Sequence, residues 1–239
     1  MASGDRSAIP AMAAGFIAMD QYISKGAGDT LNLPDGMANI GGNGKGYLLA
    51  SQTDWDPTAN SDGTVTSLAL GDDIYVYAVQ DPSGVAQWVA SKNATVPDGY
   101  TADTSRKIGG FHYGRVRPLS EAFNAGAALS QQIVPNSCWD LNNRPKCDPT
   151  GMVEIIPGAL WADIYLASED GAAWPETVPL SEYNAVPLTG TEGYAFYDYT
   201  RLARNAGKRL PTYSEWLAAA YGTPQGATGA GGRVNTGQH

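Results

Sequence analysis

Histidine and cysteine are both scarce in this chain of 239 residues, which has two of each. A tetrahedral zinc site needs four nitrogen or sulfur ligands, and Cys138 and Cys147 have no histidine near them in the sequence. A serine or cysteine nucleophile needs a base, yet His112 lies in a glycine-rich stretch and His239 is the last residue. The sequence therefore argues against zinc-dependent and hydrolytic catalysis.

Charged residues are also few, at 16% of the chain, and the net charge is −9. An acidic chain repels the phosphates of nucleic acids and of anionic lipids, so we expect neither as a main partner. No apolar run reaches the roughly 20 residues that cross a bilayer. The nearest, residues 9–19, is interrupted by Pro10 and Gly15, and we interpret it as part of the mature chain without membrane insertion.

Aromatic residues and turn formers are plentiful, with 6 Trp, 13 Tyr, 4 Phe, 29 Gly and 15 Pro. Disordered chains are poor in aromatics, so this composition indicates a folded protein rich in loops. Cys138 and Cys147 stand close together in the sequence. They are interpreted either as structural thiols or as the partners of an optional disulfide.

Short strand-like runs separated by turn clusters fill residues 31–105 and predict an antiparallel β-sandwich or barrel. These runs are residues 46–51, 64–70, 73–80 and 86–91. The glycines of residues 107–114 mark a junction, so we place a domain boundary near residue 105. Residues 1–30 are interpreted as a separate N-terminal attachment or oligomerisation segment.

Two amphipathic helices are predicted near the C-terminal end. Thr191 is the expected cap of a helix over residues 192–206, and Gly207 is its expected stop. Thr212 and Glu215 have the spacing of a capping box for a second helix over residues 212–221. Two further runs, residues 152–156 and 160–166, are candidate strands.

The segment that joins the two helices carries a recognisable motif: Gly207, Lys208, Arg209, Leu210, Pro211 and Thr212, then Glu215 and Trp216. It resembles the helical segment of the C-type lectin-like fold of the formylglycine-generating-enzyme type. The resemblance implies an α+β protein in which residues 106–239 form a lectin-like domain. In that domain Trp216 and Phe196 would wedge the two helices against a small sheet.

The order of a β-rich region, a Lys-Ile-Gly-Gly-Phe-His junction and a lectin-like segment resembles bacteriophage tail-fibre and tropism-determinant proteins. This resemblance implies a virion protein of the receptor-binding type, a homotrimer that recognises the host surface, contacts other virion proteins and catalyses no reaction. Members of the family continue through a further sheet after the second helix. We therefore expect the lectin-like domain to be incomplete within residues 106–239.

Two other functions remain open. A structural virion component, such as a collar, baseplate or capsid-decorating protein, could use the same fold for assembly. An enzyme of the formylglycine-generating type would need cysteines in the C-terminal portion as copper ligands, and none follows Cys147.

Exposed aromatic side chains are the expected means of binding, because rigid rings stack on sugars and fit protein epitopes. Trp139 and Trp174 lie in stretches with proline or asparagine, so we predict that both are exposed binding residues. No cofactor is expected. Calcium is the one alternative, at a loop with oxygen ligands from Asp54, Asp56, Asn60 and Asp62 that lacks the glycine and terminal glutamate of an EF-hand.

Overall fold

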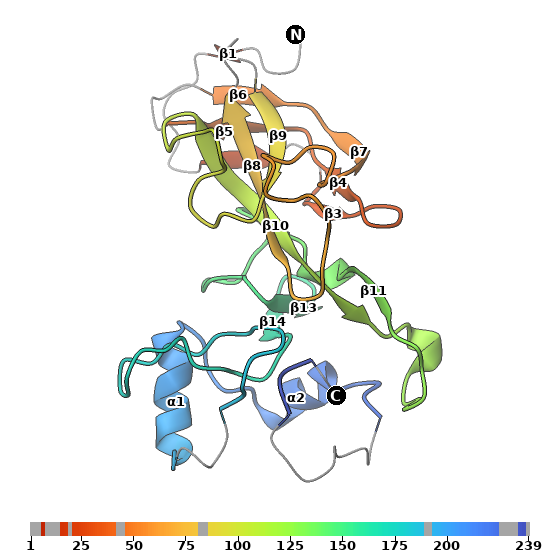
Figure 1. Cartoon of the computed structure of the whole chain (residues 1–239), viewed down its shortest axis with the longest axis vertical. Coiled ribbons are helices and arrows are strands. Elements are labelled where there is room, and N and C mark those ends of the chain that lie inside the picture. The colour runs from red at the N-terminus through yellow and green to blue at the C-terminus, as the bar shows by residue number, and fades with distance from the viewer. Residues whose placement is uncertain are drawn as a thin grey trace. The chain divides into compact units, whose positions relative to one another are not determined.

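The computed structural model describes residues 6–7, 15–18, 21–41, 46–80, 86–188, 193–224 and 234–237 (Figure 1). The chain divides into two compact units. Unit 1 comprises residues 1–114 and 132–144, and unit 2 comprises residues 115–131 and 145–239. Much of the predicted N-terminal segment, residues 1–5, 8–14 and 19–20, lies outside the described residues.

Unit 1 contains most of the β-structure. Its short strands come first: β1 (Arg6–Ser7), β2 (Phe16–Ala18), β3 (Ser24–Lys25), β4 (Leu31–Leu33), β5 (Gly36–Asn39), β6 (Gly46–Leu49) and β7 (Gln52–Trp55). The later strands are β8 (Asp73–Gln80), β9 (Ala86–Ser91), β10 (Ser105–Val116), β11 (Ser130–Ile133) and β12 (Trp139–Asp140), with 3-10 turns at Leu119–Glu121 and Pro135–Ser137. β10 and β11 each have residues in both units.

The strands form three antiparallel sheets, with orders β1-β6-β5-β2, β3-β4-β7 and β11-β10-β8-β9. β12 pairs with β10 beside the last of these sheets. β8 and β10 lie side by side in Figure 1. The strands predicted at residues 73–80 and 86–91 are confirmed as β8 and β9, because alternating β-branched and aromatic residues pack well on a pleated surface.

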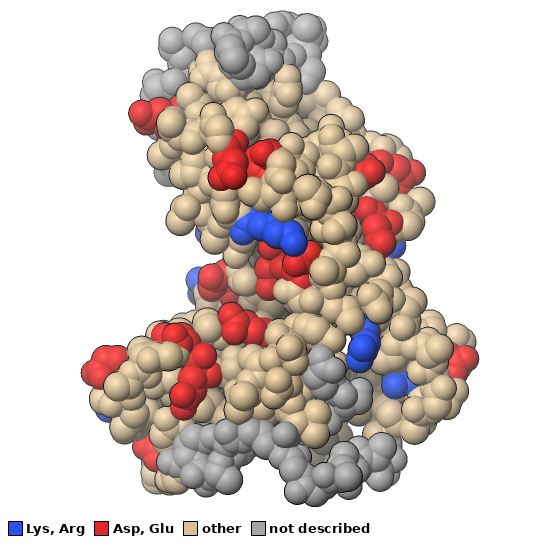
Figure 2. Space-filling view, in the orientation of Figure 1, with Lys and Arg blue, Asp and Glu red and all other residues tan. Residues whose placement is uncertain are grey.

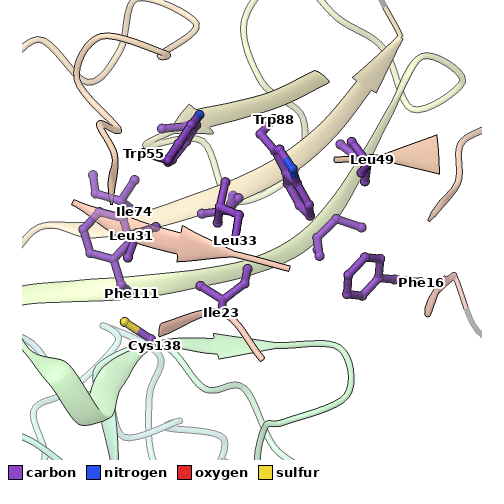
Figure 3. Close-up of a cluster of buried hydrophobic side chains, with 14 of the residues drawn as sticks. Phe16, Ile23, Leu31, Leu33, Leu49, Trp55, Ile74, Trp88, Phe111 and Cys138 are labelled. Atoms are coloured by element: carbon purple, nitrogen blue, oxygen red, sulfur yellow. The ribbon is translucent and has the colours of Figure 1, made fainter. Parts of the chain in front are cut away.

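A common core joins these sheets. Figure 3 shows Leu33 near Trp88 and Ile23, and all three side chains are buried. Phe16 packs edge-to-face on Trp88, with ring centroids 6.1 Å apart, and the Trp88 indole N–H donates to the Ala50 carbonyl at 3.0 Å. The indole therefore joins β9 to the sheet of β2 while its polar atom stays hydrogen bonded.

The strand predicted at residues 64–70 is wrong, because local side chains take the backbone amides that a strand would pair. Ser61 Oγ accepts from the amides of Gly63 and Val65, at 2.8 and 3.1 Å, and Asp62 accepts from Thr64 at 2.9 Å. Such local bonds compete with sheet pairing. The segment forms bends instead, with a turn at Leu70.

Unit 2 contains the hairpin of β13 (Met152–Ile156) and β14 (Leu160–Asp163) and two helices, α1 (Phe196–Asn205) and α2 (Tyr213–Ala219). β13 has the predicted bounds, and β14 is shorter than the predicted strand. The expected cap Thr191 lies outside the described residues, and α1 begins after Ala195. Among the described residues, neither helix has the length and apolar character that crossing a bilayer requires.

The α+β character is confirmed in this coarse form, antiparallel sheets followed by two short helices. The expected wedge of Phe196 and Trp216 is wrong, because their side chains are 68% and 54% exposed. Helical spacing shows which residues share a face but not whether another element covers it. Leu202 is the residue of α1 that is buried.

Candidate functional site

Trp174 lies in the loop between β14 and α1 and is partly exposed, as predicted. Its ring centroid is 5.3 Å from that of Tyr194, and the Arg201 guanidinium carbon lies 5.4 Å from the Trp174 ring. Tyr194 in turn packs edge-to-face on Tyr199 of α1, with centroids 5.9 Å apart. We call these four residues the Trp174 patch.

Asn205 at the end of α1 holds the Trp174 loop in place. Its side-chain Nδ2 donates to the carbonyls of Pro175 and Thr177, each at 2.9 Å. Thr177 is buried, and its hydroxyl donates to the Ala172 carbonyl at 2.8 Å. The loop is therefore fastened to the helix through its backbone, which presents the Trp174 ring on a rigid support.

Two residues of α1 complete the patch. Arg201 is exposed and lies over the Trp174 ring, and Tyr199 is half-buried against Tyr194. In the sequence, the site is marked by the aromatic-rich residues 194–199. Their contact with the Trp174 loop, about 20 residues earlier, cannot be read from the sequence.

Further aromatic side chains of unit 2 are exposed to solvent. On α1 and its flank these are Phe196 and Tyr197, and around α2 they are Tyr213, Trp216 and Tyr221. Tyr221 packs edge-to-face on Phe123, with centroids 5.4 Å apart. Exposed aromatic groups of this kind are typical of surfaces that bind other molecules.

The motif between the helices builds the start of α2. Arg209 donates to both carboxylate oxygens of Glu215, at 2.7 and 2.5 Å, and Glu215 accepts from the Thr212 amide at 2.8 Å. Thr212 Oγ1 accepts from the Glu215 amide at 3.3 Å, so the predicted capping box is confirmed. Leu210 and Pro211 are exposed and form the entry to the helix. The Arg209 hydrogen bonds lower the pKa of Glu215 to about 2.

Trp139 is buried, with 4% of its surface exposed, so the expectation that it is an exposed binding residue is wrong. Its strand β12 pairs with Gly109 and Gly110 of β10. A Cβ atom at Gly110 would lie 3.0 Å from the Trp139 indole nitrogen and 2.6 Å from the Ile74 carbonyl. The glycines of the predicted junction therefore make room for this indole inside unit 1.

The histidine that the structure describes has a structural partner. His112 is buried, and its Nδ1 lies 2.9 Å from the Asp73 carboxylate. Cys138 and Cys147 are both free thiols, and burial raises the pKa of Cys138 to about 12. His239 lies outside the described residues.

The carboxylates of the suggested calcium loop bind backbone groups. Asp54 accepts from the Ala27 amide at 2.6 Å, and Asp56 accepts from the Thr58 amide at 2.8 Å. Asp62 accepts from the amides of Thr64 and Asp98, at 2.9 and 2.7 Å. Within the part of the chain that the structure describes, no three His, Cys, Asp or Glu side chains gather as metal ligands.

Comparison with known proteins gives a consistent result. A tail fibre receptor-binding protein of Bordetella phage BPP-1 is 37% identical over 190 residues, which cover 73% of this chain and 48% of the relative. The M1 and P3c variants of the major tropism determinant each align with a TM-score of 0.68 and 29% identity, over 92% of this chain and 59% of theirs. The chain thus spans about half the length of the phage relative. The family described as "Mtd second domain" matches residues 21–140, half of the sequence, and the chain therefore belongs to the Mtd family.

Proposed function

We propose that this chain is a phage virion protein of the tail-fibre type that recognises the host surface and catalyses no reaction. Membership of the Mtd family and similarity to a protein named for receptor binding support this function. In the chain itself, the observation that carries the proposal is the Trp174 patch. There an exposed indole, flanked by Tyr194 and Arg201, is held on a rigid support.

The proposal includes a lectin-like fold for unit 2 and a sandwich arrangement of the sheets in unit 1. It also assigns Trp174 as a receptor contact and a homotrimer as the working assembly.

Acidic side chains are spread over the face shown in Figure 2 and basic ones are few, so attraction to phosphate-rich surfaces is not the basis of recognition. Aromatic stacking and shape are the expected contributions.

Binding of the purified, fluorescently labelled chain to cells of the bacterial host tests the proposal. We expect saturable binding that weakens at least about tenfold in Trp174→Ala, because a central aromatic anchor contributes most of the energy of an interface. Tyr22→Ala, which removes another exposed aromatic ring, is the matched control and should bind normally. If the chain binds purified virion proteins and does not bind cells, it acts as a structural virion component. The proposed trimer is tested separately, by analytical ultracentrifugation of the labelled chain.

A further inference from the structure

An open hollow of about 300 Å³ lies within unit 2, and none of the four residues of the Trp174 patch lines it. It is lined by three aliphatic side chains, two tyrosines, one arginine and the backbone of one segment: Leu129, Ile164, Leu166, Tyr165, Tyr183, Arg115, Thr236 and Gly237. Leu166 is 63% exposed, so apolar surface remains open to solvent at this place.

Two tyrosine rings form an aromatic wall of the hollow. The centroids of Tyr165 and Tyr183 are 5.9 Å apart, with an interplanar angle of 57°. Gly237 lies directly against them, since a Cβ atom there would be 2.6 Å from Tyr183 and 2.9 Å from Tyr165. The absence of a side chain at residue 237 lets the backbone hold both rings in position.

The segment that carries Gly237 is fastened by hydrogen bonds at Thr236. The Asn184 amide donates to the Thr236 carbonyl at 2.8 Å, and the Thr236 amide donates to the Ala185 carbonyl at 2.9 Å. The Ala185 amide donates to Thr236 Oγ1 at 2.9 Å, and the Thr236 side chain is buried. The walls of the hollow are therefore preorganised, which lowers the entropic cost of binding.

Arg115 supplies the one cation among the lining residues. Its Nη1 donates to the Gly237 carbonyl at 3.2 Å, and no carboxylate pairs with it among the described residues. Lys92, Lys208 and Arg209 have carboxylate partners, whereas Arg117, like Arg115, donates to backbone carbonyls. The remaining N–H groups of the Arg115 guanidinium can donate to both oxygens of a ligand carboxylate.

We propose that the hollow binds one anionic sugar unit of the hexuronic acid class. The C–H groups of the sugar ring would pack on Tyr165 and Tyr183, and the sugar carboxylate would pair with Arg115. One guanidinium with no second cation among the lining residues suits a single negative charge better than a phosphate dianion. This inference does not rest on the proposed host recognition.

The test compares two probes that differ in the carboxylate alone, methyl β-glucuronide and methyl β-glucoside, by titration of amide resonances of the full chain. We expect the glucuronide to shift the amides of residues 115, 165, 183 and 237 and to bind at least about tenfold more tightly than the glucoside. Arg115→Gln should remove that difference. Arg204→Gln, which changes an exposed arginine of α1, should retain it.

Equal binding of the two probes to the unaltered chain would overturn the proposal, and so would undiminished glucuronide binding by Arg115→Gln. Absence of glucuronide shifts up to about 100 mM, beyond the range of a specific sugar site, would also overturn it. The comparison of probes needs no variant, so misfolding of Arg115→Gln would not obscure the result. Since free sugars and purified protein are used, failure here would leave the host-binding test unaffected.

Discussion

The carboxylate of Asp140 accepts a hydrogen bond of 3.1 Å from the backbone amide of Ile23, a residue 117 positions earlier in the chain. The same carboxylate accepts from the amides of Asn142 and Asn143, at 2.7 and 2.9 Å, and is fully buried. Burial is the largest influence and raises the pKa of Asp140, while the three backbone bonds lower it. One side chain thus joins the start of unit 1 to β12.

Replacing Asp140 by alanine should lower the free energy of unfolding by about 3 kcal/mol, because three backbone donors would lose a buried acceptor. Urea-induced unfolding followed by tryptophan fluorescence measures the change. Asp103→Ala, at an exposed carboxylate, is the control and should cost less than about 0.5 kcal/mol. Equal effects of the two substitutions would contradict the role of Asp140.

Acid should loosen α2 through Glu215. The pKa of this carboxyl is lowered from 4.5 to about 2, so its stabilising contribution is present above pH 4.5 and is lost as the pH falls toward 2. The protection factors of the α2 amides against hydrogen exchange, which are corrected for the intrinsic pH dependence of exchange, should fall in this interval relative to pH 6, and Glu215→Gln should remove that decrease. An unchanged profile in Glu215→Gln would show that other carboxyls are responsible.

Gly237→Ala should destabilise the segment at residues 234–237. Gly237 has φ +71°, and an added Cβ would meet both tyrosine rings. Gly158 has nearly the same φ, +70°, but an added Cβ there meets nothing within 4 Å. Gly158→Ala should therefore cost about 1 kcal/mol from backbone strain alone. Gly237→Ala should cost about 1–3 kcal/mol more, seen as faster exchange of the Thr236 amide.

The two thiols should differ in reactivity toward a thiol reagent in the native protein. Cys138 is buried, which raises its pKa to about 12, whereas Cys147 is half-buried near the Met152 sulfur. We expect one thiol to react under native conditions and the second after denaturation, because the thiolate is the reactive form. Cys147→Ser should leave a native protein that does not react; fast labelling of this variant would be the contrary result.

Local features of the fold could be predicted from the sequence. β8 and β9 have the predicted bounds because their alternating residues favour strands, and the capping box of α2 follows from the spacing of Thr212 and Glu215. The segment at residues 64–70 shows the limit of this reasoning. Its composition favours a strand, but hydrogen bonds that its amides donate to Ser61 and Asp62 decide its conformation.

The candidate site was less predictable because it depends on contacts between distant segments. Exposure of Trp174 follows from its loop, but its contacts with Tyr194 and Arg201 require the fold of α1 against that loop. Trp139 has a similar polar sequence context and is nevertheless buried, because Gly109 and Gly110 leave space for its ring. No local pattern distinguishes these two tryptophans.

The attachment of the Trp174 loop by Asn205 has a consequence for sequence variation. Asn205 bonds to the main-chain carbonyls at positions 175 and 177, and every amino acid supplies such a carbonyl. Ala173, before these carbonyls, and Glu176, between them, are exposed positions and are therefore free to change identity without altering the path of the loop. Natural selection can alter the chemistry presented beside Trp174 while the underlying architecture is inherited unchanged.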